Sequence, residues 1–122
     1  MEKSQFRERI FWKQRIPHCE LAKYYATSDL FIFPSRWEVF GMVLLEALAC
    51  GVPVVTTPVG GATMLAEKNC AVSFFPIGDD KALAAQMQKE NSLEVRLFAR
   101  TLAEEYSWQN LAKLMIRNFP TR

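Results

Sequence analysis

Short apolar runs recur along the first two thirds of the chain and predict strands. LFIFP at 30–34, VPVVTT at 52–57 and AVSFF at 71–75 lack the alternation of apolar and polar residues that marks a half-exposed strand. Such runs are typical of parallel strands that are covered by helices on both faces. A fourth apolar stretch, IFW at 10–12, predicts a further strand. The pattern therefore predicts an open parallel sheet of three or four strands.

Segments with helical periodicity lie between and after these strands. They are residues 20–29, about 42–50, part of 60–69, 81–90, 92–106 and 108–119. The second helix should end at Gly51 as a left-handed C-terminal cap, and Asp79 or Asp80 should cap the fourth at its N-terminus. The predicted fold class is α/β: a partial Rossmann-like open parallel sheet flanked by helices, with a helical C-terminal third. Residues 1–122 are expected to form one domain.

Composition narrows the setting of this domain. Half of the 122 residues are hydrophobic, so a packed core is expected, and a net charge of +2 gives no reason to expect a nucleic-acid partner. Three cysteines and one histidine, His18, support neither a disulfide framework nor a metal site, and no cofactor is expected. His18 is interpreted as a structural residue. Because the sequence has no long apolar span or signal-like start, we expect a cytoplasmic protein, with peripheral membrane contact as the alternative.

A single carboxylate interrupts the most apolar of the predicted helices. Glu46 stands between Leu45 and Ala47 in MVLLEALAC. An unpaired buried carboxylate costs several kcal/mol, so this side chain needs a partner or an opening to solvent. Ligands of open α/β sheets bind where strands run into helix N-termini, and the loop that holds Glu38 lies there. Spacing alone leaves two interpretations open: a carboxylate that faces a groove, or a surface residue of an amphipathic helix.

The start of the same helix is suited to an anion. Backbone at Phe40 and Gly41 reaches the helix N-terminus, where free N–H groups and the helix dipole favour phosphate. A carboxylate nearby is better suited to hydroxyl groups, since it can accept hydrogen bonds from two neighbouring hydroxyls of a sugar. Phosphate together with paired hydroxyls predicts a nucleotide sugar as ligand.

The segment ATSDLFIFPSRWEVFGMVLLEALACGVPVVTTPVGG resembles the nucleotide-sugar-binding segment of retaining glycosyltransferases with the GT-B fold. That family's signature is a glutamate, seven residues and a second glutamate, which Glu38 and Glu46 match. The flanking patterns E-x-F-G, L-L-E-A and G-V-P-V-V are also present. This family is also known as glycosyl transferases group 1. The resemblance implies that residues 1–122 are a truncated form of its nucleotide-sugar-binding C-terminal domain.

The resemblance also implies roles for individual residues. Glu38 would contact hydroxyls of the donor sugar near the reacting centre and is the implied catalytic residue, and Glu46 would bind the ribose hydroxyls. Backbone around Gly41 would hold sugar or diphosphate, and backbone at Arg15 would lie beside the nucleobase. The implied donor-binding residues are Glu46, Phe40, Gly41, Met42, Val43, Arg15 and Ile16.

The implied reaction is the transfer of a sugar, with retention and without a metal, from a nucleotide-diphosphate sugar to an acceptor hydroxyl. The family's acceptor-binding domain and its pair of basic residues have no counterpart in this sequence. We therefore expect a weak donor binder that needs the missing domain or a separate chain that carries it. Self-association is also expected, because a sheet edge and helix faces would be uncovered. The alternative is a non-catalytic remnant or module that binds a partner protein or a membrane surface, for instance through the apolar face of 108–119.

Overall fold

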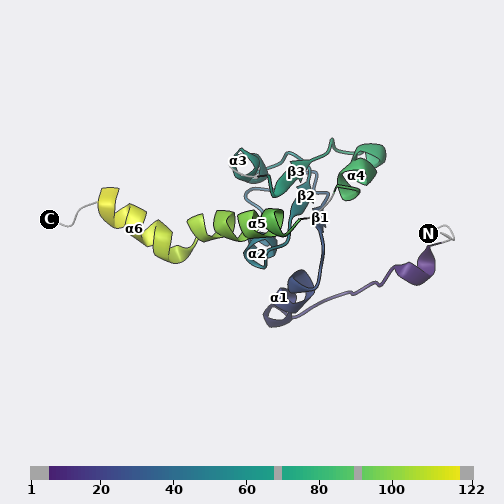
Figure 1. Ribbon diagram of the computed structural model, residues 1–122, viewed down its shortest axis with the longest axis horizontal. Helices are drawn as coiled ribbons and strands as arrows, with labels where there is room; N and C mark the ends of the chain where they lie inside the picture. Colours follow the sequence, from purple (N-terminus) through teal and green to yellow (C-terminus); the bar gives the residue numbers. More distant parts are fainter. Residues whose placement is uncertain (1–5, 68–69, 90–91, 119–122) are drawn as a thin grey trace.

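The computed structural model describes residues 6–67, 70–89 and 92–118, and its centre is a three-stranded parallel sheet (Figure 1). The strands are β1 (Phe31–Phe33), β2 (Val54–Thr56) and β3 (Val72–Phe74), in that spatial order. Ile32 lies opposite Val55, which in turn lies opposite Ser73. The predicted α/β fold with an open parallel sheet is confirmed, and its strands coincide with the three apolar runs after residue 30.

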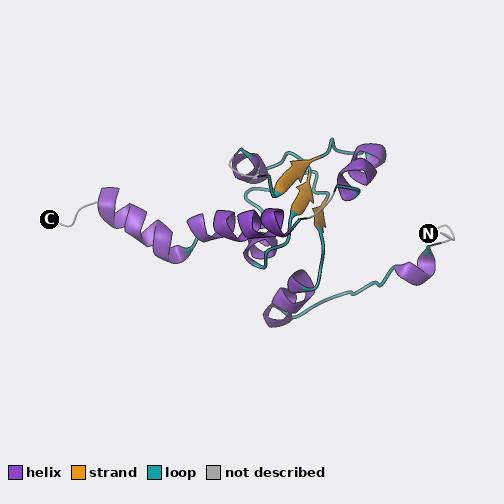
Figure 2. Ribbon diagram, viewed as in Figure 1, coloured by secondary structure: helices purple, strands orange, loops and turns teal. Residues whose placement is uncertain are grey.

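Helices cover this sheet and extend beyond it. They are the 3-10 helix η1 (Arg7–Arg9), α1 (His18–Ala26), α2 (Met42–Ala49), α3 (Ala62–Ala66), α4 (Asp80–Met87), α5 (Leu93–Glu105) and α6 (Trp108–Asn118). α2 packs against α5, α1 and the first two strands, whereas α3 contacts β3 and α4 contacts β2. Figure 2 shows the sheet between α4 and the pair formed by α2 and α5. The last third of the described chain is helical, as predicted.

The core lies between the sheet and α2. All three residues of β2 are buried, because a central strand is covered on both faces and paired on both edges. The core side chains of α2 are Leu44, Ala47 and Leu48, which are spaced three and four residues apart and so share one helix face. Leu45 packs against the edge of this core, and Glu46 beside it remains 30% exposed.

Two predicted helix caps are confirmed. Gly51 follows α2 with φ +73°, a left-handed conformation that glycine adopts without steric cost. Asp79 precedes α4, and its Oδ1 accepts a hydrogen bond of 2.8 Å from the backbone N–H of Ala82. These two caps fix where α2 ends and where α4 begins.

The strand predicted at 10–12 is wrong. Ile10 has extended backbone, but these residues belong to no strand, and Phe11 and Trp12 are 84% and 85% exposed. Within the described residues the sheet places no strand beside this segment, and an extended segment without a hydrogen-bonded neighbour is not a stable strand. The segment instead runs outward from α1 to the N-terminal end of the molecule (Figure 1).

α6 also leaves the body of the molecule. It continues from the end of α5 away from the sheet (Figure 1), and its apolar side chains are exposed, Trp108 by 81% and Ile116 by 73%. Phe119, which was expected on the same apolar face, lies outside the described residues. No helix in the described ranges is long and apolar enough to cross a bilayer. α6 and the segment before α1 thus present apolar surface at opposite ends of the molecule.

Candidate functional site

Glu46 lies in the second turn of α2, on the face that turns away from the core. Its side chain is 30% exposed and has two partners on α1. Tyr25 donates its hydroxyl to Glu46 Oε2 at 3.4 Å, and Nε2 of His18 lies 3.3 Å from Oε1. The carboxylate therefore has protein partners on both oxygens while part of it remains open to solvent.

Two hollows adjoin Glu46, one on each side of α2. The first, of about 170 Å³, lies between α1 and α2 and is lined by His18, Leu21, Ala22, Tyr25, Glu46 and Cys50. The second, of about 340 Å³, lies between α2 and α5, and its lining includes Met42, Glu46 and Arg100. Glu46 is thus directed neither into the core nor onto a bare convex surface.

The N-terminus of α2 begins at Gly41, which is buried and has φ +78°. A Cβ atom there would lie 3.1 Å from Cδ1 of Leu44 and 3.4 Å from Cγ of Glu38, so the chain turns tightly at this point. The first amides of a helix have no partner within the helix, and at α2 these include Met42 and Val43. Met42 is exposed and Val43 is half-buried. The structure places these amides one turn before Glu46.

Glu38 lies beside this helix start and is half-buried. Its Oε1 accepts a hydrogen bond of 2.8 Å from the backbone N–H of Val39, the next residue. The ring of Phe40 packs against Tyr106 at the end of α5, with ring centroids 6.4 Å apart. The contact of Phe40 with Tyr106 therefore ties the end of the loop that carries Glu38 to α5.

The loop after β2 supports the loop that holds Glu38. A Cβ atom on Gly60 would lie 2.5 Å from the carbonyl oxygens of both Glu38 and Val39, and one on Gly61 would lie 2.7 Å from the ring of Phe40. No larger residue fits at either position without displacing the neighbouring backbone. The sequence analysis assigned Gly60 and Gly61 no role at the site, because no local pattern shows that the two loops touch.

Arg15 and Ile16 lie in the segment that enters α1 through Pro17. Arg15 is exposed and Ile16 is half-buried. His18, two residues after Ile16, contacts Glu46. The structure thus brings the end of this segment next to the carboxylate through His18, and this contact is compatible with the structural role expected for that residue.

Tyr25 is the buried partner of Glu46. Burial of the phenol and the nearby carboxylate of Glu46 together raise the pKa of Tyr25 to about 12, and burial is the larger cause. Tyr25 therefore keeps its proton and remains a hydrogen-bond donor at every pH near neutrality. The sequence analysis missed this residue, since it lies 21 positions before Glu46.

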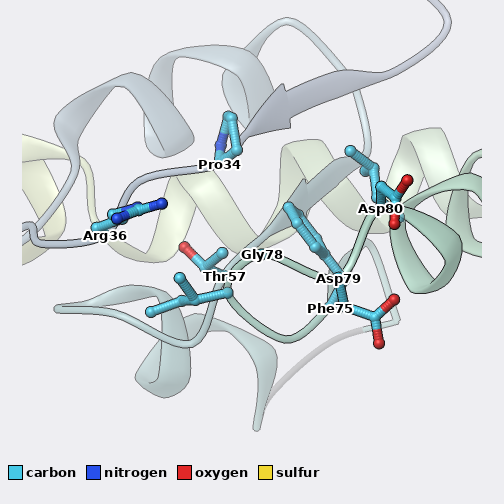
Figure 3. Close-up of a pocket in the computed structure, with 9 residues that line it drawn as sticks. Pro34, Arg36, Thr57, Phe75, Gly78, Asp79 and Asp80 are labelled. Carbon is cyan, nitrogen blue, oxygen red and sulfur yellow. The ribbon is translucent and has the colours of Figure 1, made fainter.

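A separate pocket of about 270 Å³ lies where the three strands end (Figure 3). Arg36 stands on one side of it and Asp79 and Asp80 on the other, with Thr57 between them. The Thr57 hydroxyl donates to the carbonyl of Ser35, which ties the loop after β1 to the end of β2. Neither Glu38 nor Glu46 lines this pocket. It has the position expected for ligands of open sheets but contains none of the predicted site residues.

The fold and the site together define a class of protein. An open parallel sheet with a tight loop and a helix N-terminus after its first strand is typical of α/β proteins that bind ligands at the carboxyl edge of the sheet. Residues 1–96 match the sequence profile of the family described as "Glycosyl transferases group 1". The chain belongs to this family, which confirms the resemblance found in the sequence.

Individual relatives agree with this assignment. The chain is 35% identical over 107 residues to the D-inositol 3-phosphate glycosyltransferase of Gordonia bronchialis, covering 81% of this chain and 23% of that protein. It is 34% identical over 107 residues to the O-antigen chain mannosyltransferase B of Escherichia coli, covering 78% of this chain and 26% of that one. This chain spans about a quarter of the length of these relatives.

A solved structure has the same fold. The sucrose-phosphate synthase of Thermosynechococcus elongatus superposes with a TM-score of 0.69 and 31% identity, over 92% of this chain and 30% of that one. Part of that synthase thus shares the arrangement of parallel strands and flanking helices described above.

The contact between the two loops predicts unequal effects of two glycine substitutions. Gly78, like Gly60, has positive φ, at +81°, but a Cβ atom there would meet nothing within 4 Å. Gly78→Ala should therefore cost only the backbone strain of roughly 1–2 kcal/mol. Gly60→Ala should cost a further ~1–3 kcal/mol, because the added carbon overlaps the Glu38 loop. Urea unfolding measures both, and equal losses would contradict the contact.

The raised pKa of Tyr25 predicts a loss of stability in alkali. As pH rises from 10 towards 12, the unfolded phenol ionises while the folded one keeps its proton, so the free energy of unfolding falls. The ionisation of Tyr25 should lower the free energy of unfolding by an amount on the order of 2 kcal/mol. This loss should be absent from Tyr25→Phe. Urea unfolding of both proteins between pH 9 and about 11.5 measures the difference. Tyr24→Phe, which alters the exposed neighbouring tyrosine, should behave like the native chain; parallel pH profiles for native and Tyr25→Phe would refute the assignment.

Proposed function

We propose that this chain forms the donor-binding part of a glycosyltransferase that moves a sugar, with retention, from a nucleotide-diphosphate sugar to an acceptor hydroxyl. The observation that carries the proposal is the position of Glu46, a half-buried carboxylate that opens onto two hollows one turn after the N-terminus of α2. Membership of the glycosyltransferase family supports a sugar donor as the ligand. Glu46 binds the ribose hydroxyls in this proposal.

The remaining donor contacts follow from the same arrangement. The backbone amides of Phe40, Gly41, Met42 and Val43 hold the diphosphate or sugar, because a helix N-terminus provides free N–H donors and a favourable dipole. Glu38 is the proposed catalytic residue, orienting the donor sugar by its hydroxyls. The two glutamates thus divide the donor between them, one at the sugar and one at the ribose.

The segment that contains Arg15 and Ile16 is the proposed contact for the nucleobase. It leads through Pro17 into His18, which touches Glu46. A ribose held by Glu46 would therefore have its base near this segment. Backbone atoms rather than the Arg15 side chain are proposed as the contact, which leaves the identity of the base open to experiment.

Catalysis needs more than the two glutamates and the helix amides. A leaving diphosphate requires positive charge in addition to helix amides. Among the described basic side chains, Arg36 lines the other pocket, and Arg100 lines the hollow between α2 and α5 that Glu46 also lines. We propose that the acceptor-binding domain, on this protein or on a separate chain, completes the enzyme. A cytoplasmic setting suits a nucleotide-sugar donor.

The exposed apolar surfaces favour the second candidate, a module that binds a partner protein or a membrane. α6 exposes Trp108, Met115 and Ile116, and the segment before α1 exposes Phe11 and Trp12. Lys113 and Arg117 add positive charge to α6. This alternative requires no donor at Glu46, so donor binding separates the two functions, and self-association of the isolated chain is compatible with both.

The test is a calorimetric titration of the chain with uridine, guanosine and adenosine diphosphate sugars. The native chain should bind one class weakly, and Glu46→Ala should weaken it by about tenfold or more, because hydrogen bonds to a carboxylate are lost. Glu94→Ala is the matched control: this exposed glutamate lies in the first turn of α5 and should bind as the native chain does. Absence of binding by the native chain would favour the partner-binding module, and equal affinity of Glu46→Ala would contradict the proposed role of Glu46 in holding the donor.

A further inference from the structure

The direction of the Glu46 carboxylate is set by α1. Each carboxylate oxygen contacts a different side chain of that helix: Tyr25 donates to Oε2 at 3.4 Å, and His18 lies 3.3 Å from Oε1. These two residues are seven positions apart, two turns of helix, so they reach α2 from the same face of α1. Two contacts on the two oxygens restrain rotation of the carboxylate plane as well as its position.

The carboxylate still has acceptor capacity to spare. An ionised carboxylate offers about four lone-pair positions, and the two contacts from α1 use one on each oxygen. One position per oxygen is left, and the side chain is 30% exposed. Two free acceptor positions on neighbouring oxygens match two vicinal hydroxyl groups, provided that the carboxylate plane does not rotate.

The two partners hold the carboxylate with unequal firmness. Tyr25 is buried, and its ring packs edge-on against Phe31 of β1, with ring centroids 5.3 Å apart at 85°. The His18 side chain is 84% exposed and is free to adopt other rotamers at little cost. The sheet thus anchors Tyr25, and Tyr25 is the firmer of the two constraints on Glu46.

We propose that Tyr25 is a positioning residue for donor binding, which orients the Glu46 carboxylate toward the two hydroxyls of a ribose. His18 assists on the second oxygen. This assignment rests on the proposed function, in which Glu46 holds the ribose. Its distinctive consequence is selectivity: Tyr25 contributes to the preference for a nucleotide with ribose hydroxyls and not to the binding of base or phosphate.

Selectivity separates this role from a merely structural one. If Tyr25 only supported the fold, its loss would weaken binding of all nucleotides alike. If it positions Glu46, its loss weakens binding of the ribose form and leaves the form without hydroxyls unchanged. The ratio of the two affinities is therefore the quantity to measure.

The experiment is an NMR titration of the full chain with uridine, guanosine and adenosine diphosphates and with their 2′,3′-dideoxy counterparts. The variants are Tyr25→Phe, Glu46→Gln, and Tyr24→Phe as matched control, since the exposed Tyr24 is adjacent on α1 and lines neither hollow beside Glu46. The native chain and Tyr24→Phe should prefer the ribose form about tenfold or more. Tyr25→Phe and Glu46→Gln should both lose most of this preference while keeping their affinity for the dideoxy form.

The outcomes distinguish this assignment from the proposed function on which it rests. A preference lost in Glu46→Gln but kept in Tyr25→Phe overturns the role of Tyr25 and leaves the proposed function standing. A preference kept in Glu46→Gln, or no binding of any nucleotide by the native chain, overturns the proposed function and the role of Tyr25 with it. Urea unfolding of Tyr25→Phe identifies a folded variant, and His18→Ala should reduce the preference less than Tyr25→Phe does.

Discussion

The contact between Glu46 on α2 and two side chains of α1 is the interaction on which the site depends. A carboxylate in a helix as apolar as α2 must be satisfied, because leaving it buried and unpaired costs several kcal/mol. The protein satisfies both oxygens from α1 and leaves the group 30% exposed. The same arrangement that makes Glu46 tolerable for the fold also leaves it able to accept further hydrogen bonds. In the proposed function, the carboxylate that the fold must satisfy is therefore also the one that holds the donor.

Much of the fold could be predicted from the sequence, because the relevant signals are local. The three apolar runs after residue 29 contain the three parallel strands, and Gly51 and Asp79 cap helices α2 and α4. The last third of the described chain is helical, as the periodicity predicts. The strand expected at 10–12 failed for a non-local reason. Its residues are apolar and Ile10 is extended, but a strand also needs a hydrogen-bonded neighbour, and sequence periodicity does not say whether one is present.

The site was predictable only in part, and the limit is again the distance along the chain. Spacing and resemblance selected Glu38, Glu46 and the helix start at Gly41, and all three lie within nine residues of one another. Their roles with a donor remain proposals. The partners of Glu46 lie 21 and 28 positions away along the chain. The packing of Gly60 against the Glu38 loop also joins segments that are far apart in sequence. Such contacts arise from packing of α1 on α2 and of one loop on another, which no short sequence pattern encodes.

The most direct test of the central claim is to locate a bound nucleotide by intermolecular nuclear Overhauser effects from its ribose protons. The account predicts contacts to the ring of His18 and the methyl groups of Leu21, which line the hollow between α1 and α2 next to Glu46. Contacts confined to the methyl groups of Ile77 and Leu83 would place the nucleotide in the pocket at the strand ends instead. That result would contradict the claim that Glu46 holds the ribose.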